Sequence, residues 1–247
     1  MALINLMLQG KGGVGKSFIA ALLAQYYGPR VSTLACFDTD PVNQTFAGYK
    51  AFGVEIIRLG DRADEVNPRY FDSLIEKILA LPDDAVVVID NGASTFLPLL
   101  GYMVESQALD LLADVGHQVR LHSVLIGGQA LIDTVEGLAQ VLSYAPKTEV
   151  VVWLNEYFGR VEYSDDDGHV QPFEQSGLFK KNKDRFHAIV RLPAVRKETF
   201  GLDIEQMMRA RLTFDEATQH PEFSIMARQR LRMTWRTIHA AMEQAVL

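Results

Sequence analysis

A glycine-rich stretch near the amino terminus constrains the fold of this chain more than any other feature. It reads Gly10-Lys11-Gly12-Gly13-Val14-Gly15-Lys16-Ser17, which fits the pattern G-x-x-x-x-G-K-[ST]. An apolar run at residues 3–8 precedes it, and residues 18–24 read as the start of a helix. A strand, a glycine-rich turn and a helix in this order predict a phosphate-binding loop. A plain glycine-rich surface turn is the alternative, and the two flanking elements disfavour it.

Each part of the stretch has a physical role. Gly10 and Gly15 let the backbone turn tightly, so that successive amide N–H groups point inward at phosphate oxygens. The helix that begins near Lys16 adds the positive end of its dipole to the same anion. We expect Lys16 to reach the β- and γ-phosphates and the Ser17 hydroxyl to ligate Mg²⁺. The whole stretch through Phe18 is predicted to bind the nucleotide.

Apolar runs alternate with helical patterns along almost the whole chain. Near-continuous apolar runs are typical of strands that are covered on both faces of a parallel sheet. We therefore predict a doubly wound α/β fold, with a mostly parallel sheet flanked by helices and with ligands at the carboxyl ends of the strands. The strands are predicted at residues 3–9, 31–38, 54–59, 85–90, 119–126, 150–155 and 187–192. The helices are predicted at residues 16–26, 68–81, 97–115, 128–144, 198–211 and 222–247.

Length and composition limit the classes of protein to which the chain can belong. Its 247 residues, 48% of them hydrophobic, fit a single domain over residues 1–247. The irregular stretch at residues 159–177 is predicted to be an exposed loop, and its acidic run at 165–167 to be solvated. No run of about 18 apolar residues occurs, so no membrane-spanning segment is predicted. The net charge of −7 disfavours a globally basic nucleic-acid binder but leaves a local basic patch open.

Three carboxylates follow predicted strands. Asp38 and Asp40 end the second strand, where one could hold a water on Mg²⁺ and the other could orient the attacking water. Asp90 ends an apolar run at residues 86–89. A lone carboxylate is too costly to bury there, so it should lie near a cation, and we predict that Asp90 binds Mg²⁺ through water. The alternative for all three is a turn after a strand.

Lys11 and the carboxylates resemble the motifs of one ATPase family. A lysine directly after the first glycine, as in Lys11, is not required by the general phosphate-loop pattern. Together with Lys16 it resembles the deviant Walker A motif of the ParA/MinD family. The resemblance implies that Lys11 crosses a dimer interface to the phosphates of the partner's nucleotide. It also implies that Asp40 supports hydrolysis of ATP and that Asp38 lies near the Mg²⁺ ion as one of the metal-site residues. A solvated lysine beside an anion site is the alternative for Lys11.

The adenine side of the predicted site has weaker signals. Asn155 ends a strand, and its amide can donate to and accept from one edge of a purine. The ParA/MinD resemblance places this asparagine against adenine, whereas the sequence alone fits a turn asparagine equally well. The same resemblance implies that a later segment, Arg191-Leu192-Pro193, packs against the adenine base. Pro193 is therefore one of the predicted nucleotide-binding residues. The segment Asn91-Gly92-Ala93-Ser94 departs from the family, which more often has a proline there.

The resemblance continues nearly end to end for one branch of the family, the ParA/MinD-type ATPases encoded in the transfer regions of conjugative plasmids. It implies a bacterial, cytoplasmic accessory factor in conjugal DNA transfer that uses ATP and Mg²⁺ and is a homodimer when ATP is bound. Conjugal transfer proteins or plasmid DNA are its candidate partners. The segments that carry the resemblance are residues 8–18, 38–43, 89–94, 127–131, 152–155 and 212–214.

The function predicted from these residues is a dimeric switch that binds ATP and hydrolyses it slowly. Two alternatives remain open. A P-loop kinase acting on a small molecule would keep the phosphate loop but would need an arginine-rich lid, and residues 159–177 contain only Arg160. A nucleotide-binding module without hydrolysis would fit the altered segment after Asp90.

The last predicted helix has a basic and an apolar side. Its four arginines could meet DNA phosphates or acidic lipid, but a solvated helix face is favoured. Its apolar stripe recurs at helical spacing, which favours core packing over a membrane anchor, so peripheral membrane contact is not expected. The arginines are Arg228, Arg230, Arg232 and Arg236, and the stripe comprises Leu231, Trp235, Ile238 and Met242.

Overall fold

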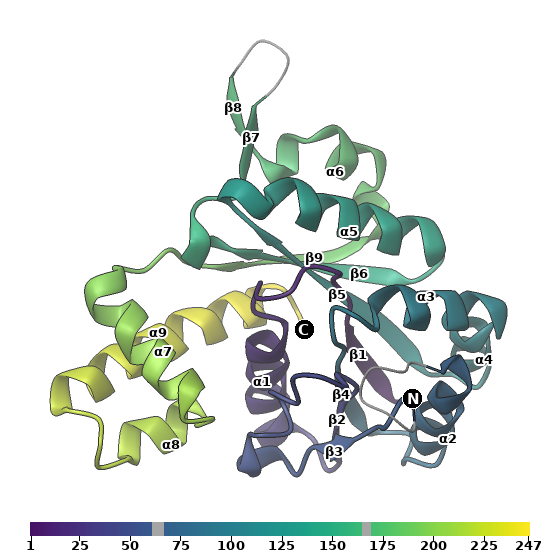
Figure 1. Ribbon diagram of the computed structural model, residues 1–247, viewed down its shortest axis with the longest axis horizontal. Helices are drawn as coiled ribbons and strands as arrows, with labels where there is room; N and C mark the ends of the chain where they lie inside the picture. The colour runs from purple at the N-terminus through teal and green to yellow at the C-terminus, as the bar shows by residue number, and fades with distance from the viewer. Residues whose placement is uncertain (61–66, 165–168) are drawn as a thin grey trace.

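The computed structural model describes residues 1–60, 67–164 and 169–247. At its centre is a seven-stranded sheet with the order β3-β2-β4-β1-β5-β6-β9, and every neighbouring pair in it is parallel (Figure 1). This confirms the predicted fold class. The strands are β1 (Leu3–Met7), β2 (Leu34–Asp38), β3 (Glu55–Ile56), β4 (Val86–Asp90), β5 (Gln118–Ile126), β6 (Glu149–Asn155) and β9 (Phe186–Leu192).

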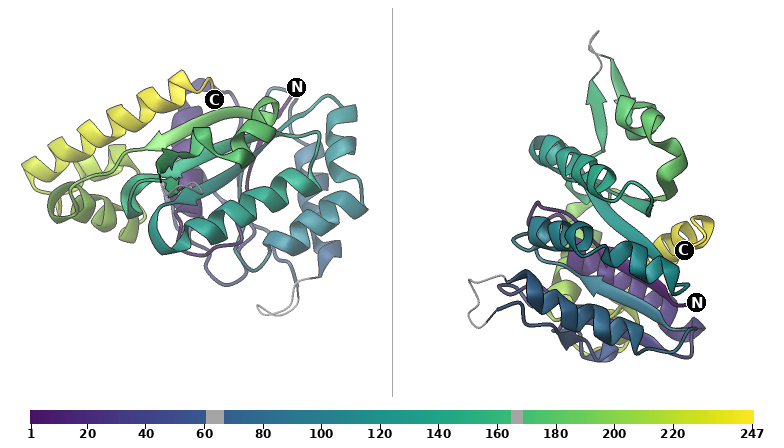
Figure 2. Two further views of the ribbon diagram at one scale, coloured as in Figure 1. Left: turned by 90° about the horizontal axis from the view of Figure 1, so that it is seen from above. Right: turned by 90° about the vertical axis from the view of Figure 1, so that its right-hand side faces the viewer.

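Helices cover both faces of this sheet (Figures 1 and 2). The first face packs against α2 (Phe71–Leu79), α3 (Phe96–Glu105), α4 (Ala108–Asp114) and α5 (Leu131–Tyr144). The second packs against α1 (Lys16–Tyr27), α7 (Leu202–Arg209), α8 (Phe214–Gln219) and α9 (Ile225–Gln244). Within β1, the side chains of Ile4 and Leu6 enter the first core, and that of Met7 enters the second. Alternate side chains of a strand point to opposite faces, so continuous apolar strands supply both cores.

The structure changes several of the predicted elements. The strand predicted at 54–59 is only the short β3, the helix predicted at 198–211 is α-helical only over α7, and α8 was not predicted. The helix predicted at 97–115 is two helices, α3 and α4, because Gln107 between them takes a left-handed conformation with φ 53°. The loop predicted at 159–177 contains an antiparallel pair, β7 (Glu162–Ser164) and β8 (Val170–Pro172), followed by the first residue of α6 (Gly177–Lys181). The acidic run at 165–167 lies outside the described residues.

The terminal helix α9 packs as its apolar stripe predicts. Leu231, Ile238 and Met242 are buried, and the ring of Trp235 stacks on Phe214 with centroids 5.3 Å apart. Core packing is therefore confirmed for this stripe. Of its arginines, Arg230 pairs with Asp203 on α7 and Arg228 donates to the carbonyl of His220, whereas Arg232 and Arg236 are exposed.

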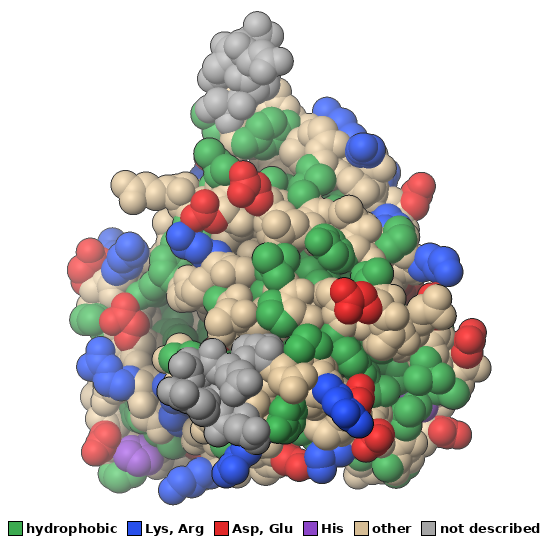
Figure 3. Space-filling view, turned by 45° about the vertical axis from the view of Figure 1, so that its right-hand side comes forward, with side chains coloured by type: hydrophobic (Ala, Val, Ile, Leu, Met, Phe, Trp, Pro, Cys, Tyr) green, Lys and Arg blue, Asp and Glu red, His purple; other side chains and the backbone are tan. Residues whose placement is uncertain are grey.

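Among the described residues, no helix is both long and apolar enough to cross a bilayer. On the side that carries α3 and α4, acidic, basic and hydrophobic side chains are interspersed (Figure 3). The basic side chains that the structure describes on this face form no continuous patch (Figure 3).

A line of polar side chains crosses the middle of the sheet. The amide of Asn5 on β1 donates to the carbonyl of Val87 over 3.2 Å and accepts from His122 Nε2 on β5 over 3.0 Å. The indole N–H of Trp153 on β6 donates to His122 Nδ1 over 2.9 Å. Each polar group is thereby satisfied although His122 is fully buried, as buried polar groups must be. The chain of bonds ties four adjacent strands together.

Candidate functional site

The glycine-rich loop connects β1 to α1 at the carboxyl edge of the sheet. Gly13 and Gly15 have φ of 74° and 103°, values that residues with a Cβ rarely adopt. Gly15 precedes α1, and no side chain caps that helix. A Cβ placed on Gly12 or Gly13 would meet no atom within 4 Å. The loop is thus an open cradle of backbone amides at an uncapped helix N-terminus, which is the geometry that binds anions.

Lys16 lies beneath this cradle. Its side chain is buried, and its ammonium donates to the carbonyl of Lys11 over 3.1 Å. Burial lowers the pKa of Lys16, while the negative charges of Asp90 and Asp40 act in the opposite direction. A buried ammonium close to two carboxylates, with one backbone acceptor, can bind a further anion.

The loop opens into a cavity of about 690 Å³. The segment after β2, the ends of β6 and β9, and helices α7 and α9 complete its walls. Most of the predicted nucleotide-binding residues meet here, while others lie behind the lining or beside it. The predicted residues that line the cavity are Gly12, Gly13, Gly15, Lys16, Ser17, Phe18, Asp40, Asn155 and Pro193. Those that do not line it are Gly10, Lys11, Val14, Asp38 and Asp90.

Asp90 ends β4 with only 1% of its surface exposed. Its Oδ1 atom has no hydrogen-bond partner. Burial raises the pKa of Asp90 to about 7, whereas hydrogen bonding by the Ser17 hydroxyl and the charge of Lys16 lower it. A fully buried carboxylate with an unpaired oxygen is costly unless a cation or a water on that cation faces it. This residue therefore fits the role of a water-mediated magnesium ligand.

Asp38 and Asp40 are bound to their own loop. Asp38 is fully buried, and its two oxygens accept from the amides of Asp40 and Ala47 over 3.0 and 2.9 Å. Burial is the largest cause of its raised pKa. Asp40 Oδ1 accepts from the amides of Val42 and Asn43, each over 2.9 Å. Asp38 thus holds the loop in place, and Asp40 presents its carboxyl group to the cavity from a fixed turn.

The segments after β2 and β4 are tightly packed against each other. A Cβ on Gly92 would lie 2.7 Å from Asp40 Cγ, closer than real Cβ contacts come. Below them, the hydroxyls of Thr39 and Thr95 both donate to Asn91 Oδ1, over 2.9 and 2.8 Å, and all three side chains are fully buried. The altered segment after Asp90 therefore serves to hold the Asp40 loop and the start of α3 together.

Lys11 lies outside the cavity. Its ammonium is 2.7 Å from Asp133 Oδ2 on α5, and both side chains are about half exposed. Next to it, the fully buried Gln9 donates to the carbonyls of Val124 and Thr134 over 2.9 and 3.0 Å. Gln9 Oε1 accepts from the Lys11 amide over 3.3 Å. The start of the loop is in this way attached to β5 and α5.

Asn155 is attached to the loop as well. Its amide donates to the carbonyl of Val14 over 2.9 Å and accepts from the Tyr157 amide over 3.3 Å. These bonds hold the end of β6 against the glycine-rich loop. They also commit one donor and one acceptor of the amide that was predicted to read adenine, so one hydrogen and one lone pair are left for a base.

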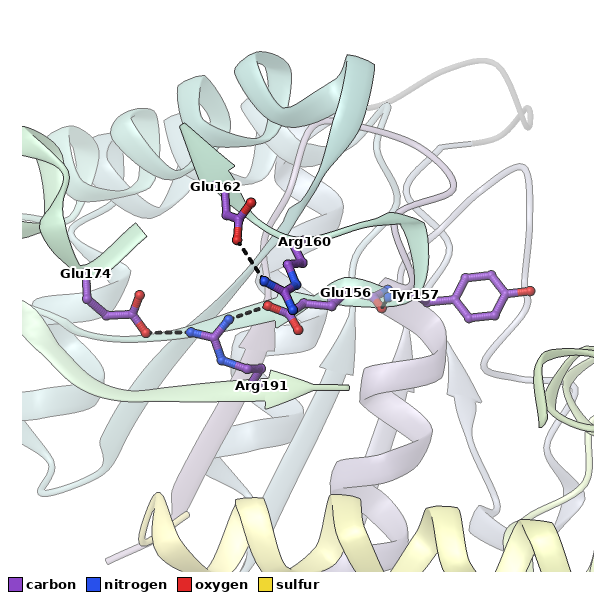
Figure 4. Close-up of polar contacts among 7 residues, drawn as sticks. Glu156, Tyr157, Arg160, Glu162, Glu174 and Arg191 are labelled. Atoms are coloured by element: carbon purple, nitrogen blue, oxygen red, sulfur yellow. Dashed lines mark hydrogen bonds and ion pairs between the residues drawn. The ribbon is translucent and has the colours of Figure 1, made fainter. Parts of the chain in front are cut away.

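An ion-pair cluster fixes the opposite wall. Arg191 on β9 pairs with Glu156 and with Glu174, the second over 2.7 Å, and so joins the end of β6 to the turn before α6 (Figure 4). Tyr157 points away from this cluster (Figure 4), and its hydroxyl donates to Glu205 on α7. Because Pro193 follows Arg191 by two residues, the cluster positions the segment that was predicted to wall the base.

Several residues of this site have no role predicted from the sequence. Gln9 and Asp133 are two of them, since Gln9 contacts Val124 and Asp133 contacts Lys11, each more than 100 residues away along the chain. Tyr49 was also missed, although it lines the cavity. Each is an ordinary residue outside any motif. The proximity of Gln9 to the glycine-rich stretch was the one local signal that could have drawn attention to it.

This chain is similar in sequence and in structure to several known proteins. No protein-family model matches it. It is 46% identical over 248 residues to two Escherichia coli sequences called Protein TraL, and each match covers 100% of both chains. Among solved structures, the cell division protein MinD of Aquifex aeolicus matches with a TM-score of 0.51 and 12% identity, over 96% of this chain and 97% of that one. MinD in its complex with MinC matches with the same TM-score and identity, over 96% and 95%. At this identity the structural likeness supports the fold alone.

Proposed function

This chain belongs to the TraL family of proteins, and from that membership we propose that it is a P-loop ATPase acting in conjugal plasmid DNA transfer. The observation that carries the ATPase part is the pair of buried, incompletely paired groups under the open glycine cradle. Lys16 offers a positive charge to an anion, and Asp90 offers an oxygen to a cation or its water. A nucleoside triphosphate with Mg²⁺ satisfies both at once.

The residues at the phosphate end have distinct tasks in this proposal. The amides of the loop bind the phosphate oxygens, and the Lys16 ammonium binds the β- and γ-phosphates. The Ser17 hydroxyl and, through water, Asp90 hold Mg²⁺, with Asp38 fixing the loop on the magnesium side. Bound Mg²⁺ would neutralise phosphate charge as the terminal bond breaks. Asp40, held in its turn by two amides, orients the attacking water.

The base occupies the other end of the cavity in this proposal. Asn155 and Pro193 line the cavity, as do the apolar side chains of Leu192, Val195 and Met208. Apolar walls suit the faces of a purine, and a few polar groups suffice to read its edge. In this proposal the remaining donor and acceptor of Asn155 bind that edge.

Dimerisation would bring Lys11 into the site of a neighbouring subunit. Its exposed ammonium is free to leave Asp133, since an exposed ion pair contributes about 1 kcal/mol or less. In two subunits that face each other with ATP bound, Lys11 of each subunit would contact the nucleotide of the other. Slow hydrolysis of ATP would then separate the two subunits. The change in assembly would alter the affinity for a conjugal transfer protein or plasmid DNA in the bacterial cytoplasm.

The first test measures ATP binding by calorimetry, hydrolysis by phosphate release, and assembly by sedimentation. Lys16→Ala should weaken ATP binding by about 1.5–3 kcal/mol, the range for a hydrogen bond to a charged group. Lys11→Ala should keep ATP binding but lose both ATP-dependent dimerisation and turnover. Lys147→Ala is the matched control, because that exposed lysine also forms a surface ion pair, with Asp110.

Each alternative function predicts a different result. A protein that stays monomeric with equal turnover in wild type and Lys11→Ala would disprove the dimer mechanism. ATP consumption only with an added small acceptor would indicate a kinase. Tight ATP binding without turnover, even with plasmid DNA and transfer proteins present, would indicate a nucleotide-binding module. A comparison of the proteins that ATP-loaded and ADP-loaded chains retain would then identify the partner.

A further inference from the structure

A second unpaired polar group lies near Asp90. Tyr49 belongs to the loop after β2, and only 2% of its surface is exposed. It lines the same cavity as the phosphate loop, and its hydroxyl has no hydrogen-bond partner. Buried hydroxyl groups are almost always paired, because an unpaired one destabilises the fold. The hydroxyl of Tyr49 therefore indicates a partner that binds in the cavity.

The ring of Tyr49 is held in place by its surroundings. It stacks on Phe52 with centroids 5.9 Å apart and belongs to the core that α1 covers. Its backbone amide donates to the carbonyl of Phe46 over 3.0 Å, in the loop that Asp38 anchors through the Ala47 amide. The hydroxyl cannot turn away to solvent without breaking this packing.

The charged groups around the Tyr49 hydroxyl indicate whether it lies near the phosphates and Mg²⁺ or near the base. Burial raises the pKa of Tyr49 to about 12, the charge of Arg211 lowers it, and the charge of Asp90 raises it. The hydroxyl is thus protonated at neutral pH and close enough to Asp90 to respond to its charge. Asp90 Oδ1 is itself unpaired. Two buried oxygens without partners, one on Asp90 and one on Tyr49, therefore lie within range of each other's charge, and Tyr49 lines the cavity.

We propose that Tyr49 is a positioning residue for the hydrated Mg²⁺ of the nucleotide complex, with its hydroxyl bound to a water of the metal that Asp90 also helps to hold. The inference rests on the proposed nucleotide site. Mg²⁺ in nucleotide sites keeps several of its waters, and those waters need acceptors on the protein. Asp90 Oδ1 supplies one acceptor and Tyr49 Oη supplies another.

The test compares Tyr49→Phe with wild type. This change removes the hydroxyl and keeps the ring that stacks on Phe52. Calorimetry with excess Mg²⁺ should give Tyr49→Phe an ATP affinity about three- to tenfold lower, the equivalent of one hydrogen bond. The same titration in EDTA should give equal affinities. Without nucleotide, the thermal midpoint of Tyr49→Phe should be equal to or above that of wild type, because no paired group is lost.

Tyr27→Phe is the matched control. The Tyr27 hydroxyl is also buried, but Tyr27 does not line the cavity and its hydroxyl lies beside Arg120. This variant should bind ATP as wild type does under both conditions. Equal Mg²⁺-dependent affinities for Tyr49→Phe and wild type would overturn the inference. So would an equal loss with and without Mg²⁺, which would mean a direct phosphate contact. A wild-type protein that binds no ATP in either buffer would overturn the proposed function as well.

Discussion

At the scale of single residues, the site depends on pairs whose members come from different loops. Gly92 and Asp40 belong to segments after different strands, and the absence of a Cβ on the first leaves room for the carboxyl group of the second. Asn155 and Val14 are a comparable pair, joined across 141 positions of sequence. Such contacts restrict the orientation of side chains, and the proposed positioning of a reacting water would depend on that restriction.

Replacing Gly92 by alanine tests the first of these pairs. The added methyl group must displace the Asp40 carboxyl group, which would break its bonds to the Val42 and Asn43 amides. We expect Gly92→Ala to lower ATP turnover by about tenfold or more, equivalent to about 1.4 kcal/mol, with ATP affinity little changed. Gly177→Ala, where a Cβ meets nothing within 4 Å, is the control. Equal turnover in both variants would contradict a role for Asp40.

At the scale of elements, side-chain contacts couple α5 to the start of the glycine-rich loop. Gln9 donates to the carbonyl of Thr134 on α5, and Asp133 on the same helix pairs with Lys11. Gly137 lies over Gln9, and a Cβ there would overlap Gln9 Oε1. A movement of α5 would therefore change the position of both the start of the loop and the lysine that is proposed to reach a second subunit.

Gly137→Ala should weaken this coupling. Alanine favours a helix over glycine by about 1 kcal/mol, but the overlap must expel the Gln9 amide or push α5 outward. Buried hydrogen bonds would be lost and the packing strained, so we expect the free energy of unfolding to fall by about 1–3 kcal/mol in urea titration. Gly101→Ala in α3, where a Cβ has open space, should instead stabilise the protein slightly. Two variants of equal stability would refute the coupling.

At the scale of the whole molecule, a buried polar line joins the two halves of the sheet. His122 accepts from Trp153 and donates to Asn5, so it is neutral in the folded protein. Burial, aided by the charges of Arg120 and His187, lowers its pKa from 6.5 to about 3. Between these values the unfolded chain binds a proton that the folded chain does not, so acid favours unfolding. The contribution of neutral His122 to the free energy of unfolding is full above pH 6.5 and is lost as the pH falls from 6.5 toward 3.

This makes the stability of the sheet pH-dependent. Relative to His122→Gln, wild type should gain about 1.4 kcal/mol of unfolding free energy per pH unit between about pH 4 and 6. Asp90, whose raised pKa has the opposite effect in the same range, is common to both proteins and cancels in the difference. Urea titrations at several pH values measure it, with the exposed His169→Gln as a control. A constant difference across pH would show that His122 is not buried as a neutral group.

The sequence alone determined the fold class and the strand, glycine-rich turn and helix at the amino terminus, because both depend on local patterns. Apolar runs such as residues 86–89 specify strands covered on two faces, and the spacing of Gly10, Gly15 and Lys16 specifies the turn. The split at Gln107 and the short β7–β8 pair were missed, because a single backbone conformation or a pairing of three residues leaves little trace in composition.

Only the tertiary structure decided which groups lie unpaired and which are already engaged. It left Asp90 Oδ1 and the Tyr49 hydroxyl without partners, committed part of the Asn155 amide to Val14, and placed Lys11 against Asp133. Each of these outcomes depends on segments that are distant in the chain and meet at the carboxyl edge of the sheet. A hydrogen bond is defined by distance and angle between two such segments, and no spacing within one of them encodes it.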